Sequence, residues 1–200
     1  TMAGVRIVRI PYKGGGPALN ALMGGEVQLM FATAGAASPH IKSGRLRALD
    51  ATTGRLLWRH DLVMDLGGFI RVNGYASSPL AVGNTIVLPV GGKAGALVAF
   101  DQATGRIAWQ SPPDRISPAS PILIELGGST QIVAFLYDRV AGFDPRSGRE
   151  LWSHPHVTDF GLNVATPVWL PDQVLVVSSA YNGGTRALKL EASPRATAVR

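Results

Sequence analysis

From residue 49 onward, the chain is built of short apolar runs that alternate with turn residues. Residues 80–82 precede Gly83-Asn84 and a second apolar run, 85–90, and residues 122–137 repeat this order around Gly127-Gly128. Paired runs of this length with glycine or asparagine between them predict β-hairpins.

A ten-residue motif joins further pairs of apolar runs and occurs three times. It has the form apolar-Asp-x-x-(Thr/Ser)-Gly-Arg-x-x-Trp at residues 49–58, 100–109 and 143–152. Its aspartates lie 51 and 43 residues apart. Repetition at such a period predicts stacked supersecondary units.

Each copy of the motif predicts a turn followed by a returning strand. The Asp carboxylate accepts N–H groups of the turn, and the Gly stands where φ is positive. Ile107 and Trp109 are two residues apart, so we expect both on one face of the returning strand. The third copy has Glu150 in place of Ile107, which makes that face less apolar. A Trp at one place per unit is expected to pack on the neighbouring unit. We therefore assign to structure the repeated residues Asp50, Gly54, Trp58, Asp101, Gly105, Trp109, Asp144, Gly148 and Trp152.

The strand order predicts a β-propeller. Each complete round has four short strands and opens with Ser/Thr-Pro, at 78–79, 120–121 and 166–167, as propeller blades do. The fold class we expect is mainly β, with an incomplete propeller of about three four-stranded blades over residues 49–200. The last round reaches residue 191 without the Gly-Arg-x-x-Trp of the motif, so we expect exposed blade edges that favour association.

Residues 1–48 follow another pattern. A partly alternating run to Ile10 and an apolar run at 27–31 indicate strands, and Pro17 and Ser38-Pro39 indicate helix starts. This segment is predicted to be a short β-α-β-α fragment of the α/β class. Gly14-Gly15-Gly16 lacks the spacing of a nucleotide-binding loop, so a turn is the favoured role.

Composition agrees with short strands and narrows the chemistry. The 200 residues include 24 Gly and 14 Pro, no Cys, and a net charge of +6. Most of that charge lies in residues 1–48, where the cations are scattered without interleaved aromatic residues, so we expect no nucleic-acid binding. Neither a transmembrane run nor a signal peptide is found in the sequence.

Few residues suggest chemistry. His154 and His156 share a face if the chain is extended there, and with Asp159 they could ligate a metal. Zinc needs three or four ligands, so a turn-stabilising pair of histidines is favoured. We therefore assign no catalytic, cofactor-binding or metal residues. The ligand-binding candidates are loop residues expected at one end of a propeller channel, with turn stabilisation as the alternative: Asn163, Tyr181 and Asn182.

The three motif copies and the Ser/Thr-Pro openings resemble the PQQ-like repeat propellers over residues 49–200. That class includes outer-membrane assembly lipoproteins and quinoprotein dehydrogenases, so the resemblance implies a periplasmic location. Pyrroloquinoline quinone (PQQ) enters as a cofactor only through this resemblance. The cysteine pair of many such enzymes is absent.

Residues 9–19, 24–31 and 39–49 resemble the periplasmic receptors of the tripartite tricarboxylate transporter family, which implies a fragment of one carboxylate-binding lobe. This part and the propeller meet within Arg47-Ala48-Leu49, with no Pro/Ser-rich linker. Such a junction is unusual for two independent domains, and it indicates a fragment or a chimera of residues 1–48 and 49–200.

The repeated residues build blades, so the sequence favours a non-catalytic binding or scaffold module and, on balance, a protein that is not an enzyme. Protein partners are expected at blade edges or at the channel face. The alternatives are a carboxylate receptor fragment and, with less support, a quinoprotein dehydrogenase fragment.

Overall fold

A computed structural model describes residues 45–50, 52–69, 74–192 and 197–199. These residues form fourteen strands and one short 3-10 helix, η1 (Pro171–Gln173). The mainly β fold class is confirmed. The elements of the predicted β-α-β-α segment all precede residue 45, so they lie outside the described residues.

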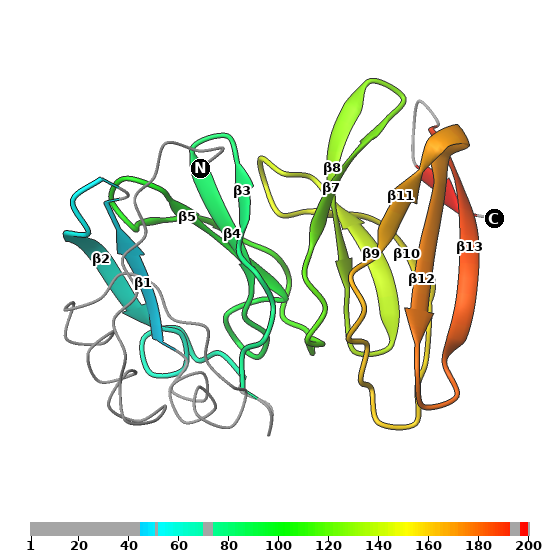
Figure 1. Cartoon of the computed structure of the whole chain (residues 1–200), viewed down its shortest axis with the longest axis horizontal. Helices are drawn as coiled ribbons and strands as arrows, with labels where there is room; N and C mark the ends of the chain where they lie inside the picture. Colours follow the sequence, from blue (N-terminus) through cyan, green and yellow to red (C-terminus); the bar gives the residue numbers. More distant parts are fainter. Residues whose placement is uncertain (1–44, 51, 70–73, 193–196, 200) are drawn as a thin grey trace, which may run out of the picture.

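Three four-stranded antiparallel sheets follow one another along the chain, and a two-stranded hairpin precedes them. Each sheet keeps its strands in chain order, as a propeller blade does. We call the hairpin blade 1 and the sheets blades 2, 3 and 4; Figure 1 shows them side by side. Blade 1 contains β1 (Arg45–Leu49) and β2 (Leu56–Asp61), and blade 2 contains β3 (Leu80–Val82), β4 (Thr85–Pro89), β5 (Leu97–Asp101) and β6 (Ile107–Gln110).

The remaining two blades have the same organisation. Blade 3 contains β7 (Ile122–Leu126), β8 (Ser129–Phe135), β9 (Arg139–Phe143) and β10 (Glu150–Pro155). Blade 4 contains β11 (Val168–Leu170), β12 (Val174–Ser179), β13 (Gly184–Ala192) and β14 (Thr197–Val199). The expected three four-stranded blades are therefore present.

The motif joins the last two strands of blades 1, 2 and 3, and each of these hairpins contains a register shift. In blade 2, Ile107 pairs with Phe100 and Trp109 pairs with Ala99. Phe100 and Ala99 are neighbours and point to opposite faces. The prediction that Ile107 and Trp109 share a face is therefore wrong, because the bulge adds a residue between them.

Strand β1 crosses the predicted boundary at residue 48. Arg47 pairs with Arg59 and Ala48 with Trp58, so the residues just before Leu49 belong to the first blade hairpin. Leu46 and Ala48 also pack against the cluster between blades 1 and 2.

Apolar side chains from facing sheets fill the space between successive blades. Phe100 and Trp58 belong to the cluster between blades 1 and 2, and Phe143 and Leu97 to that between blades 2 and 3. Trp152 packs with Leu175, Leu188 and others between blades 3 and 4. Alternating strand residues thus supply the two faces of each blade. Within the part of the chain that the structure describes, no helix is long and apolar enough to cross a membrane.

Candidate functional site

The motif turn is closed by its own aspartate. In the second copy, Asp101 Oδ1 accepts the backbone N–H of Thr104 at 2.8 Å and its hydroxyl at 2.6 Å. Gly105 N–H donates to the Asp101 carbonyl at 2.9 Å with φ of 72°. Asp50 and Thr53 repeat these contacts at 2.7 Å each. All of these bonds lie within a few residues, which is why the spacing folds locally.

These hydrogen bonds also fix the ionisation of the repeated carboxylates. The Thr53 and Thr104 hydroxyls lower the pKa of Asp50 and Asp101 from the ordinary value of 3.8. At Asp144 the main cause of the lowered pKa is the backbone N–H of Arg146. A general acid near neutral pH needs a raised pKa, so the three aspartates are suited to holding turns.

Two motif tryptophans join neighbouring blades. Trp58 Nε1 donates to the Gln102 carbonyl of blade 2 at 2.9 Å, and Trp109 Nε1 donates to the Pro145 carbonyl of blade 3 at 2.9 Å. Each indole also lies against the motif glycine of that next blade. A Cβ on Gly105 would lie 2.6 Å from the Trp58 ring, and one on Gly148 would lie 2.3 Å from the Trp109 ring. The second and third motif turns thus each receive the indole of the preceding motif copy.

Trp152 makes a different contact. Its Nε1 donates to Gln131 Oε1 of its own blade at 2.7 Å. Its indole also lies against Gly142, where a Cβ would be 2.1 Å from Nε1. The segment that joins β13 to β14 lacks the Asp-x-x-(Thr/Ser)-Gly-Arg sequence. The acceptor of the other two tryptophans is therefore replaced by a buried glutamine.

Asn163 lies in the connection from β10 to β11 and is fully buried. Its Nδ2 donates to the Leu136 carbonyl at 2.7 Å and the Tyr137 carbonyl at 3.3 Å, and its Oδ1 accepts the Ser179 hydroxyl at 2.5 Å. Its side chain therefore ties the connection to blades 3 and 4 and leaves no polar atom for a ligand.

Tyr181 and Asn182 lie together in the turn between β12 and β13, which follows Ser179, the residue whose hydroxyl bonds to Asn163. Both have positive φ, 57° and 64°. The Tyr181 ring stands edge-on to Phe160 at 5.2 Å, and Asn182 Nδ2 donates to Asp159 Oδ2 at 2.5 Å. The structure thus places these two candidates on an exposed loop surface.

His156 follows β10 and has no exposed surface. Its ring stands edge-on to Phe135 at 4.9 Å, and neither ring nitrogen has a hydrogen-bond partner among the described residues. Burial lowers the pKa of His156, and the charges of Arg186 and His154 lower it further. Within the described ranges, no three His, Asp or Glu side chains converge into a metal site, and the set with Asp159 is not assembled.

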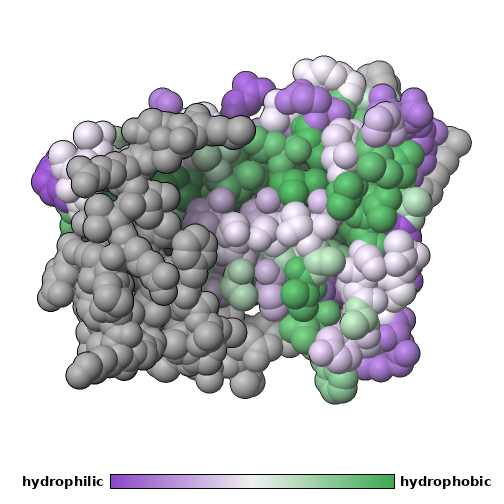
Figure 2. All heavy atoms as spheres, in the orientation of Figure 1, coloured by the Kyte–Doolittle hydropathy of each residue, from purple (hydrophilic) through white to green (hydrophobic). Residues whose placement is uncertain are grey.

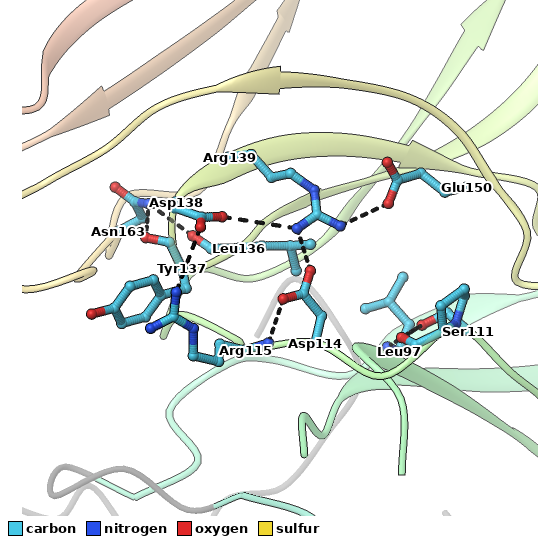
Figure 3. A network of polar contacts seen from close by, with 11 residues as sticks. Leu97, Ser111, Asp114, Arg115, Leu136, Tyr137, Asp138, Arg139, Glu150 and Asn163 are labelled. Atoms are coloured by element: carbon cyan, nitrogen blue, oxygen red, sulfur yellow. Dashed lines mark hydrogen bonds and ion pairs between the residues drawn. The ribbon is translucent and has the colours of Figure 1, made fainter. Parts of the chain in front are cut away.

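A network of charges between blades 2 and 3 was not predicted. Arg139 of β9 contacts Asp114 Oδ2, donates to Glu150 Oε2 at 2.8 Å and lies 3.8 Å from Asp138 Oδ1 (Figure 3). Burial acts to lower the pKa of Arg139, but the bonds and charges of Glu150 and Asp114 outweigh it and raise the pKa. The one signal in the sequence is Glu150, the charged residue at a motif position that is otherwise apolar.

Arg115 extends this network toward solvent. Its guanidinium lies 3.6 Å from the centroid of the Tyr137 ring and 3.6 Å from Asp138 Oδ2. Figure 3 shows the two arginines on either side of Asp138. The network joins the connection after β6 to the turn between β8 and β9, so it holds blades 2 and 3 in register.

A groove of about 940 Å³ opens between blades 2 and 3, at the end where the motif turns lie. Its rim is formed by the β3–β4 turn, the β7–β8 turn and the third motif, and the first two lie at the upper edge in Figure 1. Its volume is in the range of ligand sites in proteins. The lining includes Asn84, Trp109, Leu123, Thr130, Arg146, Arg149 and Leu151.

Comparison with known sequences gives a family match over most of the chain. Residues 15–196 match the family described as outer membrane protein assembly factor BamB, PQQ_2. This range includes part of the segment that resembles a transporter receptor. No curated protein matches the chain.

Solved structures resemble this chain at low identity. BamB from Moraxella catarrhalis is 18% identical with a TM-score of 0.50, over 76% of this chain and 48% of that one. The computationally designed Ika8 protein is 18% identical with a TM-score of 0.47, over 73% and 40%. Quinohemoprotein alcohol dehydrogenase from Comamonas testosteroni is 16% identical with a TM-score of 0.43, over 75% and 29%. The chain thus spans about half the length of the first of these structures.

Proposed function

Because this chain belongs to the family of outer membrane protein assembly factor BamB, we propose that it is a non-catalytic β-propeller module that binds a protein partner during outer-membrane protein assembly. We propose a periplasmic location, because the family is described as an outer membrane protein assembly factor and because the repeats resemble those of periplasmic propellers. The proposal concerns the part of the propeller that this chain contains.

The role of the repeated residues carries the proposal. The motif concentrates the residue types that chemistry needs, namely Asp, Thr, Arg and Trp. The aspartates and threonines close turns, and Trp58 and Trp109 join blades. The charged side chains of the Arg139 network are likewise paired with one another. These side chains hold the blades in fixed positions. They therefore favour a rigid surface for binding a partner over a site for catalysis.

The resemblance also brings in PQQ, whose enzymes use a calcium ion. Calcium needs six to eight oxygen ligands, and in the described ranges no three acidic or histidine side chains gather into such a set. The residues that the structure describes therefore offer no cluster of charged ligands for the metal of the quinone.

Complementation tests the proposed function. A bacterial strain that lacks its own family member would express the chain in the periplasm, and assembled outer-membrane β-barrel proteins would be measured by their heat-dependent gel mobility. We expect wild-type chain to raise their level and a Trp109→Ala variant, which loosens blades 2 and 3, to raise it less. Equal levels with and without the wild-type chain would contradict the proposal.

A parallel assay addresses the enzyme alternative. The purified chain would be mixed with PQQ, calcium, a primary alcohol and an electron-accepting dye. We expect no dye reduction above that of the mixture without protein. Turnover that needs both quinone and calcium would replace the binding proposal with a dehydrogenase.

A second candidate function is the binding of a small carboxylate. It rests on the sequence resemblance of residues 9–49 to the transporter receptors. Calorimetric titration of the full chain with di- and tricarboxylates tests it. Saturable heat would support a receptor-like role for this segment, and its absence would remove that candidate without touching the propeller.

A further inference from the structure

The groove between blades 2 and 3 has an apolar floor held in place by the blade contacts. Trp109 Nε1 is bound to the Pro145 carbonyl at 2.9 Å, and the ring lies against Gly148. Leu123 of β7 is 38% exposed and also lines the groove, as does Leu151 of β10 at the opposite edge of blade 3. Because the indole is fixed at its N–H and at its face, the floor is preorganised for an apolar side chain.

The rim of the groove carries two cations that form no salt bridge among the described residues. Arg146 and Arg149 come from the third motif turn, and both are exposed. Within the described part of the chain, neither guanidinium lies within 4.0 Å of a carboxylate. The acidic residue of the lining is Asp144, whose Oδ1 accepts the Arg146 backbone N–H at 2.8 Å inside the turn. The Asp144 carboxylate attracts both guanidinium groups, and both are exposed to an external acid.

Neutral polar groups complete the rim. Asn84 lies in the β3–β4 turn, and Ser129 and Thr130 lie at the start of β8. The Thr130 hydroxyl already donates to Glu125 Oε1 at 2.5 Å, so it can only accept from a peptide N–H. The Asn84 amide and the Ser129 hydroxyl can bond to a peptide backbone, while guanidinium groups bind carboxylates with two parallel hydrogen bonds. The groove thus offers partners for a main chain, for acidic side chains and for an apolar side chain.

We propose that this groove binds an extended acidic segment of a protein partner, with carboxylates on Arg146 and Arg149 and an apolar side chain on Trp109. This inference names the partner chemistry of the proposed binding function and rests on it. Two cations beside one indole are too few to follow a nucleic-acid backbone, which needs a charged track with several stacking platforms. The recessed floor also favours an inserted side chain over a flat membrane surface.

Fluorescence anisotropy with the full chain tests the groove. The probe is a short end-labelled peptide in which glutamates alternate with leucines, and a lysine–leucine peptide serves as the opposite-charge probe. We expect the acidic peptide alone to bind, with an affinity that falls as salt is raised. Replacement of both cations, Arg146→Glu with Arg149→Glu, is expected to weaken it about tenfold.

The chain supplies a matched control. Arg106 has the same motif position in blade 2 as Arg149 has in blade 3, but it does not line the groove. Arg106→Glu should leave peptide affinity unchanged. The neutral pair Arg146→Gln and Arg149→Gln, with melting curves for every variant, separates lost binding from lost folding. Absence of wild-type binding, or an equal loss in Arg106→Glu, would overturn the proposal.

Two competitors decide the class of ligand. Single-stranded DNA or anionic phospholipid vesicles that displace the peptide in an arginine-dependent way would overturn the assignment to a protein segment. The complementation assay with the wild-type chain separates the two proposals. If the wild-type chain complements but does not bind the peptide, the groove proposal fails and the function stands. If the peptide binds through the arginines and the wild type does not complement, the assembly function fails and the acidic-segment site stands.

Discussion

At the scale of single residues, the motif glycines have two separate duties. Gly105 and Gly54 both have positive φ, 72° and 69°. A Cβ on Gly105 would overlap the Trp58 ring at 2.6 Å, whereas one on Gly54 would meet nothing within 4 Å among the described atoms. Comparing the two positions therefore separates backbone strain from steric overlap.

We predict that Gly105→Ala destabilises the protein by about 2–5 kcal/mol, because backbone strain adds to displacement of the indole. The matched variant Gly54→Ala should cost about 1–2 kcal/mol from backbone strain alone. Denaturant unfolding measures both free energies. Equal losses would show that the Trp58 contact is not as tight as its geometry indicates.

The buried imidazole of His156 makes stability depend on pH. Its pKa is lowered by burial from the ordinary 6.5, so the unfolded chain takes up this proton more readily than the folded chain does. The stability that the neutral ring contributes is therefore complete above pH 6.5 and is lost as the pH falls below that value.

The variant His156→Leu tests this dependence. It should change the unfolding free energy at pH 8 by less than about 1 kcal/mol, because it removes a buried polar group that has no partner among the described residues. Melting temperatures measured between pH 8 and pH 5 should fall less steeply for the variant than for the wild type. Parallel curves would mean that His156 is protonated equally in both states.

At the scale of elements, the connection after β6 is held to blade 3 by the Arg139 network. The side chain of Arg139 is 27% exposed, and those of Asp114 and Glu150 are 21% and 31% exposed. Removal of the guanidinium would leave two half-buried carboxylates side by side without their cation. The loss should therefore exceed that of an exposed ion pair.

We predict that Arg139→Met lowers the unfolding free energy by about 1–3 kcal/mol. Arg115→Met is the control, since the Arg115 side chain is 60% exposed and its loss should cost about 1 kcal/mol or less. Chemical denaturation of both variants at one salt concentration gives the comparison. Indistinguishable losses would place the network among ordinary surface pairs.

At the scale of the whole molecule, the outer face of blade 4 repeats the face by which blade 2 packs on blade 3. Leu80 stands opposite Val87 in blade 2, and Val168 stands opposite Val176 in blade 4. The first pair packs in the cluster between blades 2 and 3, whereas Val168 is 52% exposed. Figure 2 shows apolar residues gathered over β11 at the right of the molecule.

This face predicts concentration-dependent association of the purified chain. Lysine at two of its positions, Val168→Lys with Leu170→Lys, should reduce the association constant at least about tenfold by adding charge to the contact. Val157→Lys is the control, because Val157 is 64% exposed and lies outside the strands of blade 4. Sedimentation velocity measures the change. A wild-type chain that stays monomeric at high concentration would contradict the prediction.

The sequence by itself determined the turns, the hairpins and their grouping into blades. Thr104 and Gly105 both donate to Asp101 within five residues, so their spacing is enough to specify the turn. Repetition then specified the propeller class and indicated that the motif is structural.

Only the tertiary structure decided which distant groups meet. Trp58 finds the Gln102 carbonyl 44 residues away, and Arg139 reaches Asp114 across 25 residues. The bulge that separates Ile107 from Trp109 depends on pairing with β5. Asn163, expected at a loop position at one end of the propeller channel, is buried and bonds to residues of blades 3 and 4. Sequence spacing encodes contacts within a turn, whereas contacts between sheets depend on how whole blades pack, and no local pattern records that packing.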